Sequence, residues 1–228
     1  MAMNDNEFLI SEIFHSIQGE GRYAGVPSVF IRLCRCNRQC SFCDTEFNTI
    51  NRKMTLEEMK DELAKPEYRG ANVIWTGGEP TLHFESIENL KAIGGKITNW
   101  HIETDGDFIC KNPSEHNLQN GISYDRLMET IDYLVCSPKC EPTAKKVHND
   151  LVIDGWLPED EFEIKIVTDL DKTFAFYKYA TSLMPLSYDD PAKTYETKLK
   201  VAEYCVKNNV RFCPRLQVDL WGFAKRGV

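Results

Sequence analysis

Runs of β-branched and aromatic residues recur along the chain, and segments with helical spacing of apolar residues lie between them. Such runs predict β-strands, and strand-loop-helix units in series predict a mainly parallel sheet. The strands are expected at residues 28–33, 73–76, 97–103, 133–136, 162–167 and 210–216. We see no linker within the 228 residues. The pattern therefore predicts one α/β domain, residues 1–228, folded as a partial (incomplete) β/α barrel.

Three segments are predicted to be helices. The first begins at a capping-box pattern of Thr55 and Glu58 and ends before Pro66, and the second covers residues 85–93. In a third helix, the apolar side chains that share one face are Tyr195, Leu199, Ala202 and Val206. The spacing in residues 171–179 is ambiguous between helix and strand.

Three cysteines, Cys36, Cys40 and Cys43, follow the strand at residues 28–33 with the spacing C-x3-C-x2-C. Three thiolates on one short loop can hold three irons of a 4Fe-4S cube and leave the fourth iron open for a small molecule. Alternatively, Cys34 joins them in a structural zinc site with four thiolates, or the thiols are incidental. Zinc knots usually use two separated C-x2-C pairs, and only one such pair is present, which favours the open cluster.

The composition narrows the class of protein and the compartment in which it works. Hydrophobic residues make up 42% of the chain, enough for a core, and no apolar run approaches the roughly 20 residues that cross a bilayer. The nine cysteines are an odd number and the N-terminus is acidic and polar, which favours reduced or metal-bound thiols in a cytosol. The net charge of −8 disfavours nucleic-acid binding. We expect a cytoplasmic enzyme with no nucleic acid and no membrane as partner.

Further motifs follow strands or turns. In Thr76-Gly-Gly-Glu-Pro80, the glycines allow a ligand close to the backbone, and Glu79 offers a carboxylate to an ammonium group. The run Phe14 to Gly21 bears Gln18 and Glu20, a set suited to the donor and acceptor edge of a heterocycle such as a pterin. Taken alone, each motif is more often an ordinary turn.

Several motifs occur in an order that is specific to one family. They are Ser16-Ile-Gln-Gly-Glu-Gly21, Gly25-Val-Pro, Val29-Phe-Ile-Arg-Leu33, the three cysteines, Cys43-Asp-Thr45, Thr76-Gly-Gly-Glu-Pro80, Glu103-Thr-Asp-Gly106 and Ser137-Pro-Lys139. In this respect the chain resembles the 7-carboxy-7-deazaguanine synthases, radical S-adenosylmethionine (SAM) enzymes of queuosine and 7-deazapurine biosynthesis. The resemblance implies a homodimeric lyase with a radical SAM type of partial barrel. It also implies conversion of 6-carboxy-5,6,7,8-tetrahydropterin to 7-carboxy-7-deazaguanine with loss of ammonia.

The resemblance further implies a 4Fe-4S cluster, SAM and Mg²⁺ as cofactors, and a flavodoxin- or ferredoxin-type reductant. The expected cluster ligands are Cys36, Cys40 and Cys43, and Thr45 is the expected Mg²⁺ ligand. Residues expected to line SAM are Phe42, Cys43, Asp44, Gly78, Glu79, Thr104, Ser137, Pro138 and Lys139. Residues expected to hold the pterin are Ile17, Gln18, Gly19, Glu20, Arg32, Thr76, Gln217 and Val228. No side chain is assigned as a catalytic acid or base.

The chain departs from the family pattern at four places, and one of them is Cys34, where relatives often have a small residue. Arg35 stands where relatives have a glycine, Asp105 stands in place of a serine, and residues 215–219 lack a substrate-contacting His. Two alternative functions stay open: a radical SAM activase of a glycyl-radical enzyme, and a non-catalytic zinc-stabilised binding module. Gln18 and Glu20 argue against the activase. The sequence does not indicate whether the product serves tRNA, a secondary metabolite or modified DNA.

Overall fold

The computed structural model describes residues 6–40, 43, 49–94, 99–114, 121–171 and 174–222. Its main feature is a nine-stranded sheet in the order β11-β10-β9-β8-β5-β4-β2-β1-β3. The strands are β1 (Glu7–Ile17), β2 (Pro27–Leu33), β3 (Arg52–Thr55), β4 (Asn72–Gly77), β5 (Trp100–Thr104), β8 (Tyr133–Cys136), β9 (Phe162–Thr168), β10 (Ser182–Pro185) and β11 (Arg211–Phe212). The short strands β6 (Ile109–Cys110) and β7 (Ile122–Ser123) form a separate pair.

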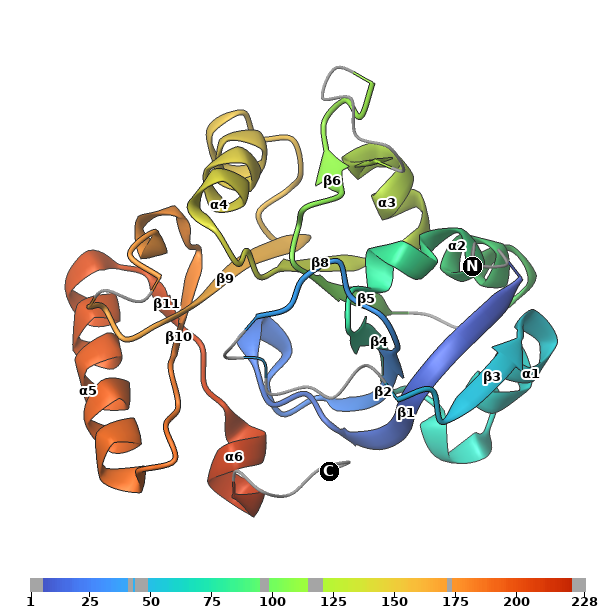
Figure 1. Cartoon of the computed structure of the whole chain (residues 1–228), viewed down its shortest axis with the longest axis horizontal. Helices are drawn as coiled ribbons and strands as arrows, with labels where there is room; N and C mark the ends of the chain where they lie inside the picture. Colours follow the sequence, from blue (N-terminus) through green and yellow to red (C-terminus); the bar gives the residue numbers. More distant parts are fainter. Residues whose placement is uncertain are drawn as a thin grey trace.

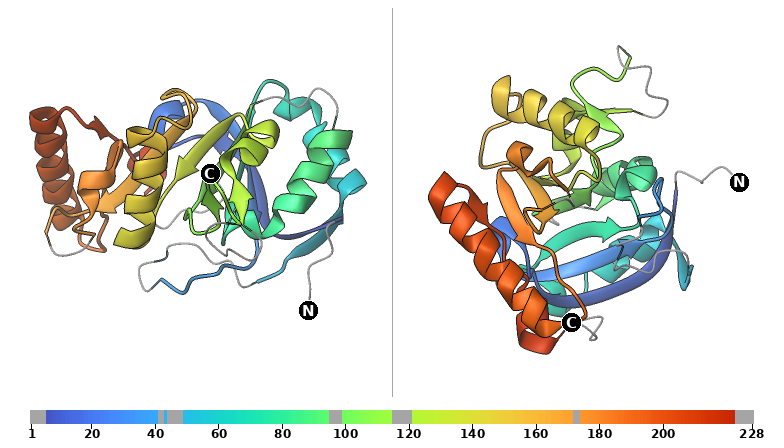
Figure 2. Two further views of the ribbon diagram at one scale, coloured as in Figure 1. Left: turned by 90° about the horizontal axis from the view of Figure 1, so that it is seen from above. Right: turned by 60° about the vertical axis from the view of Figure 1, so that its left-hand side comes forward.

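The sheet is an open half barrel. All neighbouring pairs from β2 to β11 are parallel, whereas β1 pairs antiparallel with β2 and β3. The sheet curves around a central space, with β3 and β11 as its edges (Figure 1). Two further views show the same open curve (Figure 2). The predicted α/β class and partial barrel are therefore confirmed.

Helices cover the outer face of this curve (Figures 1 and 2). They are α1 (Leu56–Leu63), α2 (Phe84–Ile93), α3 (Tyr124–Thr130), α4 (Glu141–His148) and α5 (Pro191–Asn208), whereas α6 (Leu216–Trp221) lies against the loop at Gly19 instead. Shorter helical turns are η1 (Gly21–Tyr23), η2 (Pro66–Tyr68), η3 (Pro80–His83), η4 (Asn149–Ile153) and η5 (Tyr177–Tyr179). The predicted capping box is confirmed, because the Thr55 side chain accepts from the Glu58 N–H while Glu58 accepts from the Thr55 N–H. Within the described residues, no helix has the length and apolar character to span a bilayer.

One predicted strand was wrong, and another strand was not predicted. The 11-residue strand β1 was not predicted, and it continues to Ile17, into the segment interpreted as a turn. A strand over residues 210–216 was wrong: β11 covers only Arg211–Phe212, and α6 begins at Leu216. Pro214 lies between them and has no N–H to donate to a strand ladder. The described part of residues 171–179 forms only the short turn η5.

The orientation of α5 also differs from the apolar pattern. The side chains that α5 buries are Thr197, Val201 and Cys205, where the helix packs on β10 and β11. The face predicted from Tyr195, Leu199, Ala202 and Val206 points outward instead, and Val206 is 86% exposed. The position of the helix over the sheet edge, which the sequence period does not encode, decides which face is buried.

Alternate residues of each strand face opposite sides of the sheet. Side chains on the outer side form the hydrophobic core under the helices, among them Ile31, Leu33, Trp75, Ile102, Leu134 and Ile164. The intervening positions carry Arg32, Thr76, Glu103, Glu163 and Lys165. The half barrel therefore has an apolar outside, which packs on helices, and an inside that carries these polar side chains together with apolar ones such as Ile74 and Val135.

Candidate active site

The Gly77-Gly78 turn packs directly against the cysteine loop. The N–H of Gly78 donates to the carbonyl of Leu33 at 2.9 Å, and the N–H of Glu79 donates to that of Arg35 at 2.8 Å. A Cβ on Gly78 would lie 1.8 Å from the Arg35 carbonyl oxygen, so only glycine allows this approach. The structure thus brings together the two motifs that the sequence singled out.

The Glu79 carboxylate is a buried acceptor at the end of β4. It is 1% exposed and accepts from the Thr104 hydroxyl at 2.7 Å and from the Asp105 N–H at 2.8 Å. The N–H and hydroxyl of Thr81 also donate to it. Burial, together with the nearby Asp105, raises the pKa of Glu79 to about 7. A buried carboxylate of this kind can also accept a hydrogen bond from an incoming amino group.

The cysteine loop presents three thiols outside disulfides, with Cys36 and Cys40 half-buried and Cys43 exposed. Burial raises the pKa of Cys36 and Cys40. Cys34 is 1% exposed, and its thiol donates to the Thr49 carbonyl at 3.3 Å. Among the described side chains, no three His, Cys, Asp or Glu residues converge on one metal position. Each thiolate of a 4Fe-4S cube binds its own iron, and the loop offers three thiols for three irons.

The segment after β8 lies beside the same strand ends. The N–H of Ser137 donates to the Thr104 carbonyl at 2.7 Å. The Lys139 ammonium donates to the Ser137 hydroxyl at 2.9 Å, and Pro138 between them is buried. Gly78, Glu79, Thr104 and Ser137 to Lys139 are therefore neighbours, as the expected SAM site requires.

One carboxylate, that of Glu103, connects several of the expected pterin residues. Its two oxygens accept from the Gln18 amide at 3.0 Å and from the Thr76 hydroxyl at 3.1 Å. Strand register places Thr76 beside Arg32, because these residues are partners in the β2–β4 ladder. Gln18, Thr76 and Arg32 therefore line one row inside the half barrel, with Ile17 at the end of β1.

Glu20 lies in an ion-pair network with residues of β9 and of the start of α6. Its carboxylate accepts from the Lys165 ammonium at 2.6 Å and from the Gln217 amide at 2.7 Å, and Arg215 lies 3.5 Å away. Burial alone would raise the pKa of Glu20, but Lys165 and Arg215 lower it to about 2. Gln217 also packs on Gly19, where a Cβ would lie 1.6 Å from its Oε1. Because Lys165 and Arg215 already balance the negative charge of Glu20, its carboxylate mainly holds the loop in place and is not a free acceptor for a ligand.

The Arg32 guanidinium lies on the inner face with a carboxylate partner. Its Nε is 3.1 Å from Glu12 Oε2, and its side chain is 25% exposed. The guanidinium also lies 5.6 Å from the centre of the Phe14 ring. A planar, permanently charged side chain at this position can bind a substrate carboxylate with two parallel hydrogen bonds.

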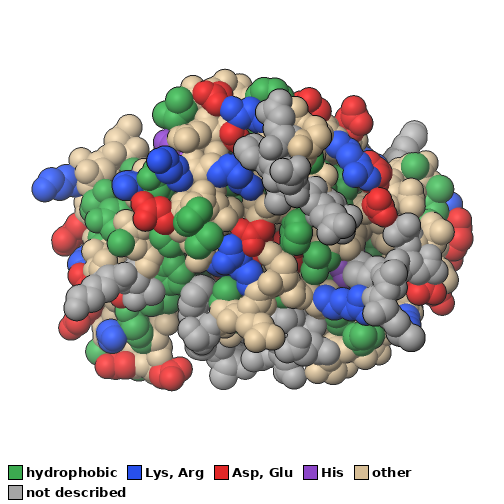
Figure 3. Space-filling model, turned by 45° about the horizontal axis from the view of Figure 1, so that its top comes forward, with side chains coloured by type: hydrophobic (Ala, Val, Ile, Leu, Met, Phe, Trp, Pro, Cys, Tyr) green, Lys and Arg blue, Asp and Glu red, His purple; other side chains and the backbone are tan. Residues whose placement is uncertain are grey.

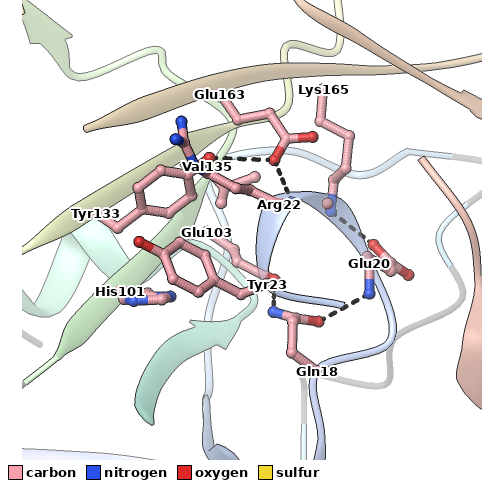
Figure 4. A pocket seen from close by; sticks show the side chains of 11 residues that line it. Gln18, Glu20, Arg22, Tyr23, His101, Glu103, Tyr133, Val135, Glu163 and Lys165 are labelled. Atoms are coloured by element: carbon pink, nitrogen blue, oxygen red, sulfur yellow. Dashed lines mark hydrogen bonds and ion pairs between the residues drawn. The ribbon is translucent and has the colours of Figure 1, made fainter. Parts of the chain in front are cut away.

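A small cavity opens beside these residues (Figure 4). Its lining residues include Gln18, Glu103, Lys165, Tyr23, His101, Tyr133 and Glu163. Its volume of about 10 Å³ holds about one water molecule, so a heterocycle must displace side chains or occupy the space next to it. Burial lowers the pKa of His101 to about 4, which keeps the imidazole neutral near pH 7. Over the described part of one face, Lys and Arg side chains lie close to Asp and Glu side chains (Figure 3).

Sequence reasoning missed Glu103 and Lys165 as site residues, although both lie in strands it predicted. The available signal was their position: polar residues alternate with apolar ones in β5 and in β9, Phe162-Glu-Ile-Lys-Ile-Val-Thr168. In a strand whose other face is a hydrophobic core, such residues must point to an inner polar site. The expected site residues that lie outside the described residues are Phe42, Asp44, Thr45 and Val228.

Comparisons with known proteins show what the chain is similar to. The family model of the radical SAM superfamily matches residues 30–112. The 7-carboxy-7-deazaguanine synthase of Bacteroides thetaiotaomicron is 40% identical over 132 residues, 57% of this chain and 60% of that one. That of Thermoplasma acidophilum is 32% identical over 171 residues, 73% of this chain and 74% of that one. The crystal structure of QueE from Escherichia coli matches with a TM-score of 0.51 and 21% identity over 91% of this chain and 93% of that one, a likeness of fold.

Proposed function

The chain belongs to the 7-carboxy-7-deazaguanine synthase family of the radical SAM superfamily, and we propose that it converts 6-carboxy-5,6,7,8-tetrahydropterin to 7-carboxy-7-deazaguanine with release of ammonia. The observation that carries this proposal is the shared acceptor Glu103, which holds Gln18 and Thr76 in one inner row beside Arg32. A glycyl-radical activase would need no such set of donors and acceptors for a heterocycle.

The radical SAM family uses SAM and a 4Fe-4S cluster, and the residues described above fit both groups. Bound together, the two groups supply hydrogen-atom abstraction, which side chains cannot perform. We propose that Cys36, Cys40 and Cys43 bind the cluster. Glu79 would accept a hydrogen bond from the amino group of SAM, and Thr104 fixes the Glu79 carboxylate for this contact. The contribution of the protein is to bind, orient and exclude water.

The inner row would bind the pterin. We propose that Arg32 binds its carboxylate, while the amide of Gln18 and the carboxylate of Glu103 read the donor and acceptor edge of the ring. Lys165 stays cationic: burial alone would lower its pKa, but Glu20 and Glu103 raise it. It therefore holds Glu20 and the Gln18–Gly21 segment in place.

We predict that SAM affinity depends on the ionisation of Glu79. An ionised carboxylate accepts the amino N–H better than a neutral acid, and the pKa of Glu79 is raised to about 7. The dissociation constant should therefore fall as pH rises from 6 to 8 and then level off, with up to about a tenfold change per pH unit below the pKa. Equilibrium dialysis of SAM against the cluster-loaded protein measures this. Glu79→Gln reports any pH dependence that SAM itself brings; an equally steep profile in this variant would contradict the assignment.

We further propose that Mg²⁺ bridges the protein and the carboxypterin through Thr45. Mg²⁺ takes about six oxygen ligands at about 2.1 Å, often few of them from protein. A single neutral hydroxyl is a weak ligand, so the metal should bind well only with the pterin present. Thr45→Ala should lower turnover and blunt its Mg²⁺ dependence, whereas Thr45→Ser should keep much of both. A wild-type Mg²⁺ titration curve in Thr45→Ala would place the metal elsewhere.

We propose a homodimer in the cytoplasm, reduced by a flavodoxin- or ferredoxin-type protein. All nine cysteines stand outside disulfides, as in a reducing compartment. The outward face of α5 exposes 63% of Tyr195, 47% of Leu199 and 86% of Val206, an apolar stripe that a second copy can cover. Val206→Glu should shift the molecular mass in light scattering toward the monomer, while Val152→Glu, at another exposed apolar side chain, should not. Unchanged mass in Val206→Glu would exclude α5 as the interface.

Two measurements on anaerobically purified protein test the function. Iron and sulfide in place of zinc would exclude a zinc-stabilised binding module. Incubation of the reconstituted protein with SAM, a reductant and the carboxypterin should then yield the deazaguanine. Radical formation on a protein partner without pterin turnover would instead support the activase.

A further inference from the structure

Arg38 lies inside the cysteine loop, between Cys36 and Cys40, but its side chain binds outside that loop. Its Nε and Nη2 donate to the two carboxylate oxygens of Asp107, both at 2.7 Å. This is the two-pronged geometry in which a guanidinium binds a carboxylate most strongly. The same Nε lies 3.3 Å from Oδ2 of Asp105, which is 6% exposed. One side chain thus ties the cysteine loop to the segment after β5.

The Asp107 carboxylate contacts side chains from two other segments and thereby joins three segments of the chain. Besides Arg38, it accepts from the Asn37 amide at 2.9 Å and from the Thr143 hydroxyl, in α4, at 2.8 Å. The Arg38 Nη2 also donates to the Cys140 sulfur at 3.3 Å. The hydrogen bonds to Asp107 raise the pKa of Arg38 further, so the guanidinium stays charged. The cysteine loop, the end of β5 and the start of α4 are therefore held by one charged group.

The backbone of Arg38 contacts a cluster cysteine directly. Its N–H donates to Sγ of Cys36 at 3.4 Å. Hydrogen bonds to cysteine sulfurs stabilise an iron–sulfur cluster and raise its reduction potential. The residue that carries this N–H is anchored through its guanidinium to Asp107.

We propose that Arg38 is a positioning residue: its pair with Asp107 holds the cysteine loop so that the Arg38 N–H donates to the Cys36 thiolate of the bound cluster. This inference rests on the proposed function, because it requires a cluster on Cys36. Arg38, Asp107 and Asp105 then hold the cysteine loop in place, which the cysteines cannot do alone. Removing either partner of the pair frees the loop and weakens the same hydrogen bond.

The test compares reconstituted Arg38→Met and Asp107→Asn with wild type in the absence of substrate. Both variants should lose iron to a chelator about threefold to tenfold faster, the scale of one partly exposed charged pair. Arg38→Lys keeps the positive charge but not the two parallel hydrogen bonds. Its rate of iron loss should therefore lie between those of wild type and Arg38→Met. The matched control is Arg126→Met, because Arg126 binds Glu88 in a similar fork, at 3.0 and 2.7 Å, away from the loop.

The reduction potential separates positioning from simple charge. Removing a positive charge lowers the potential and removing a negative charge raises it, so a charge effect would move Arg38→Met and Asp107→Asn in opposite directions. Loss of the N–H···S hydrogen bond should lower the potential in both variants. Opposite shifts, wild-type iron loss, or a lower melting temperature with unchanged potential would each overturn the proposal.

Two further outcomes are distinguished. If Cys140→Ser alone reproduced the iron loss of Arg38→Met, Arg38 would act through that sulfur and the proposal would be wrong. If wild-type protein itself assembled no cluster, the proposed function would fail first. A wild-type cluster with normal turnover, together with variants that match wild type, would overturn the inference about Arg38 only.

Discussion

Replacing Cys36, Cys40 or Cys43 by alanine is expected to remove the cluster and abolish turnover, whereas Cys34→Ala should keep both. Each of the three thiolates would bind a different iron, so no neighbour can replace a lost one. Cys34 is buried, and its thiol donates to the Thr49 carbonyl, which is a structural contact. Iron and sulfide analysis, with the absorption spectrum of each reconstituted variant, measures the outcome.

The same series tests the alternative zinc site. Cys34→Ala removes a small buried side chain, so modest destabilisation of roughly 1 kcal/mol is expected, without loss of iron. If Cys34→Ala alone abolished metal binding, a four-thiolate site that includes Cys34 would be the better assignment. Cys110→Ala serves as the control, since Cys110 is equally buried and free.

Arg32→Ala is expected to raise the KM for the carboxypterin about tenfold to a hundredfold, while SAM cleavage without substrate persists. Leaving a charged recognition partner unpaired costs roughly 1.5–3 kcal/mol, which corresponds to this range. Arg32→Lys should recover only part of the affinity, because lysine lacks the planar fork. Glu103→Gln should also raise the KM, since it replaces the acceptor for Gln18 and Thr76 with an amide. Steady-state kinetics and a SAM-cleavage assay measure these effects.

A matched control separates recognition from loss of an ion pair. Arg52 lies in β3 and pairs with Glu62 at 3.3 Å, much as Arg32 pairs with Glu12, but not in the inner row. Arg52→Ala should leave the KM unchanged. Equal loss of pterin turnover and of SAM cleavage in Arg32→Ala would move Arg32 out of the substrate site.

The parts of the site that could be predicted from the sequence are contiguous motifs. The cysteine loop, the Gly77-Gly78 turn and Glu79 are each encoded within a few residues. Their mutual contact follows from parallel strand order, which places both turns at the carboxyl ends of neighbouring strands. The contact between the Glu79 N–H and the Arg35 carbonyl confirms that inference.

The parts that were missed depend on register and on distant chain segments. Glu103 meets Gln18 across 85 residues, and Lys165 meets Glu20 across 145. No local pattern specifies such pairs; they require knowing which strands are neighbours and which face is inside. Likewise, nothing near Arg38 in sequence indicates Asp107, 69 residues away. The outward face of α5 shows the same limit, because two faces of that helix could each have packed on the sheet.

The mass and yield of product from the carboxypterin, with SAM limiting and a reductant present, report directly whether the protein catalyses this conversion. The proposed product equals the substrate minus one ammonia, so the conversion needs no net oxidant and SAM need not be consumed. We expect a species lighter than the substrate by one ammonia, one ammonium ion per product, and more product than SAM supplied. Recovery of unchanged pterin from protein that carries its cluster and cleaves SAM would contradict this expectation.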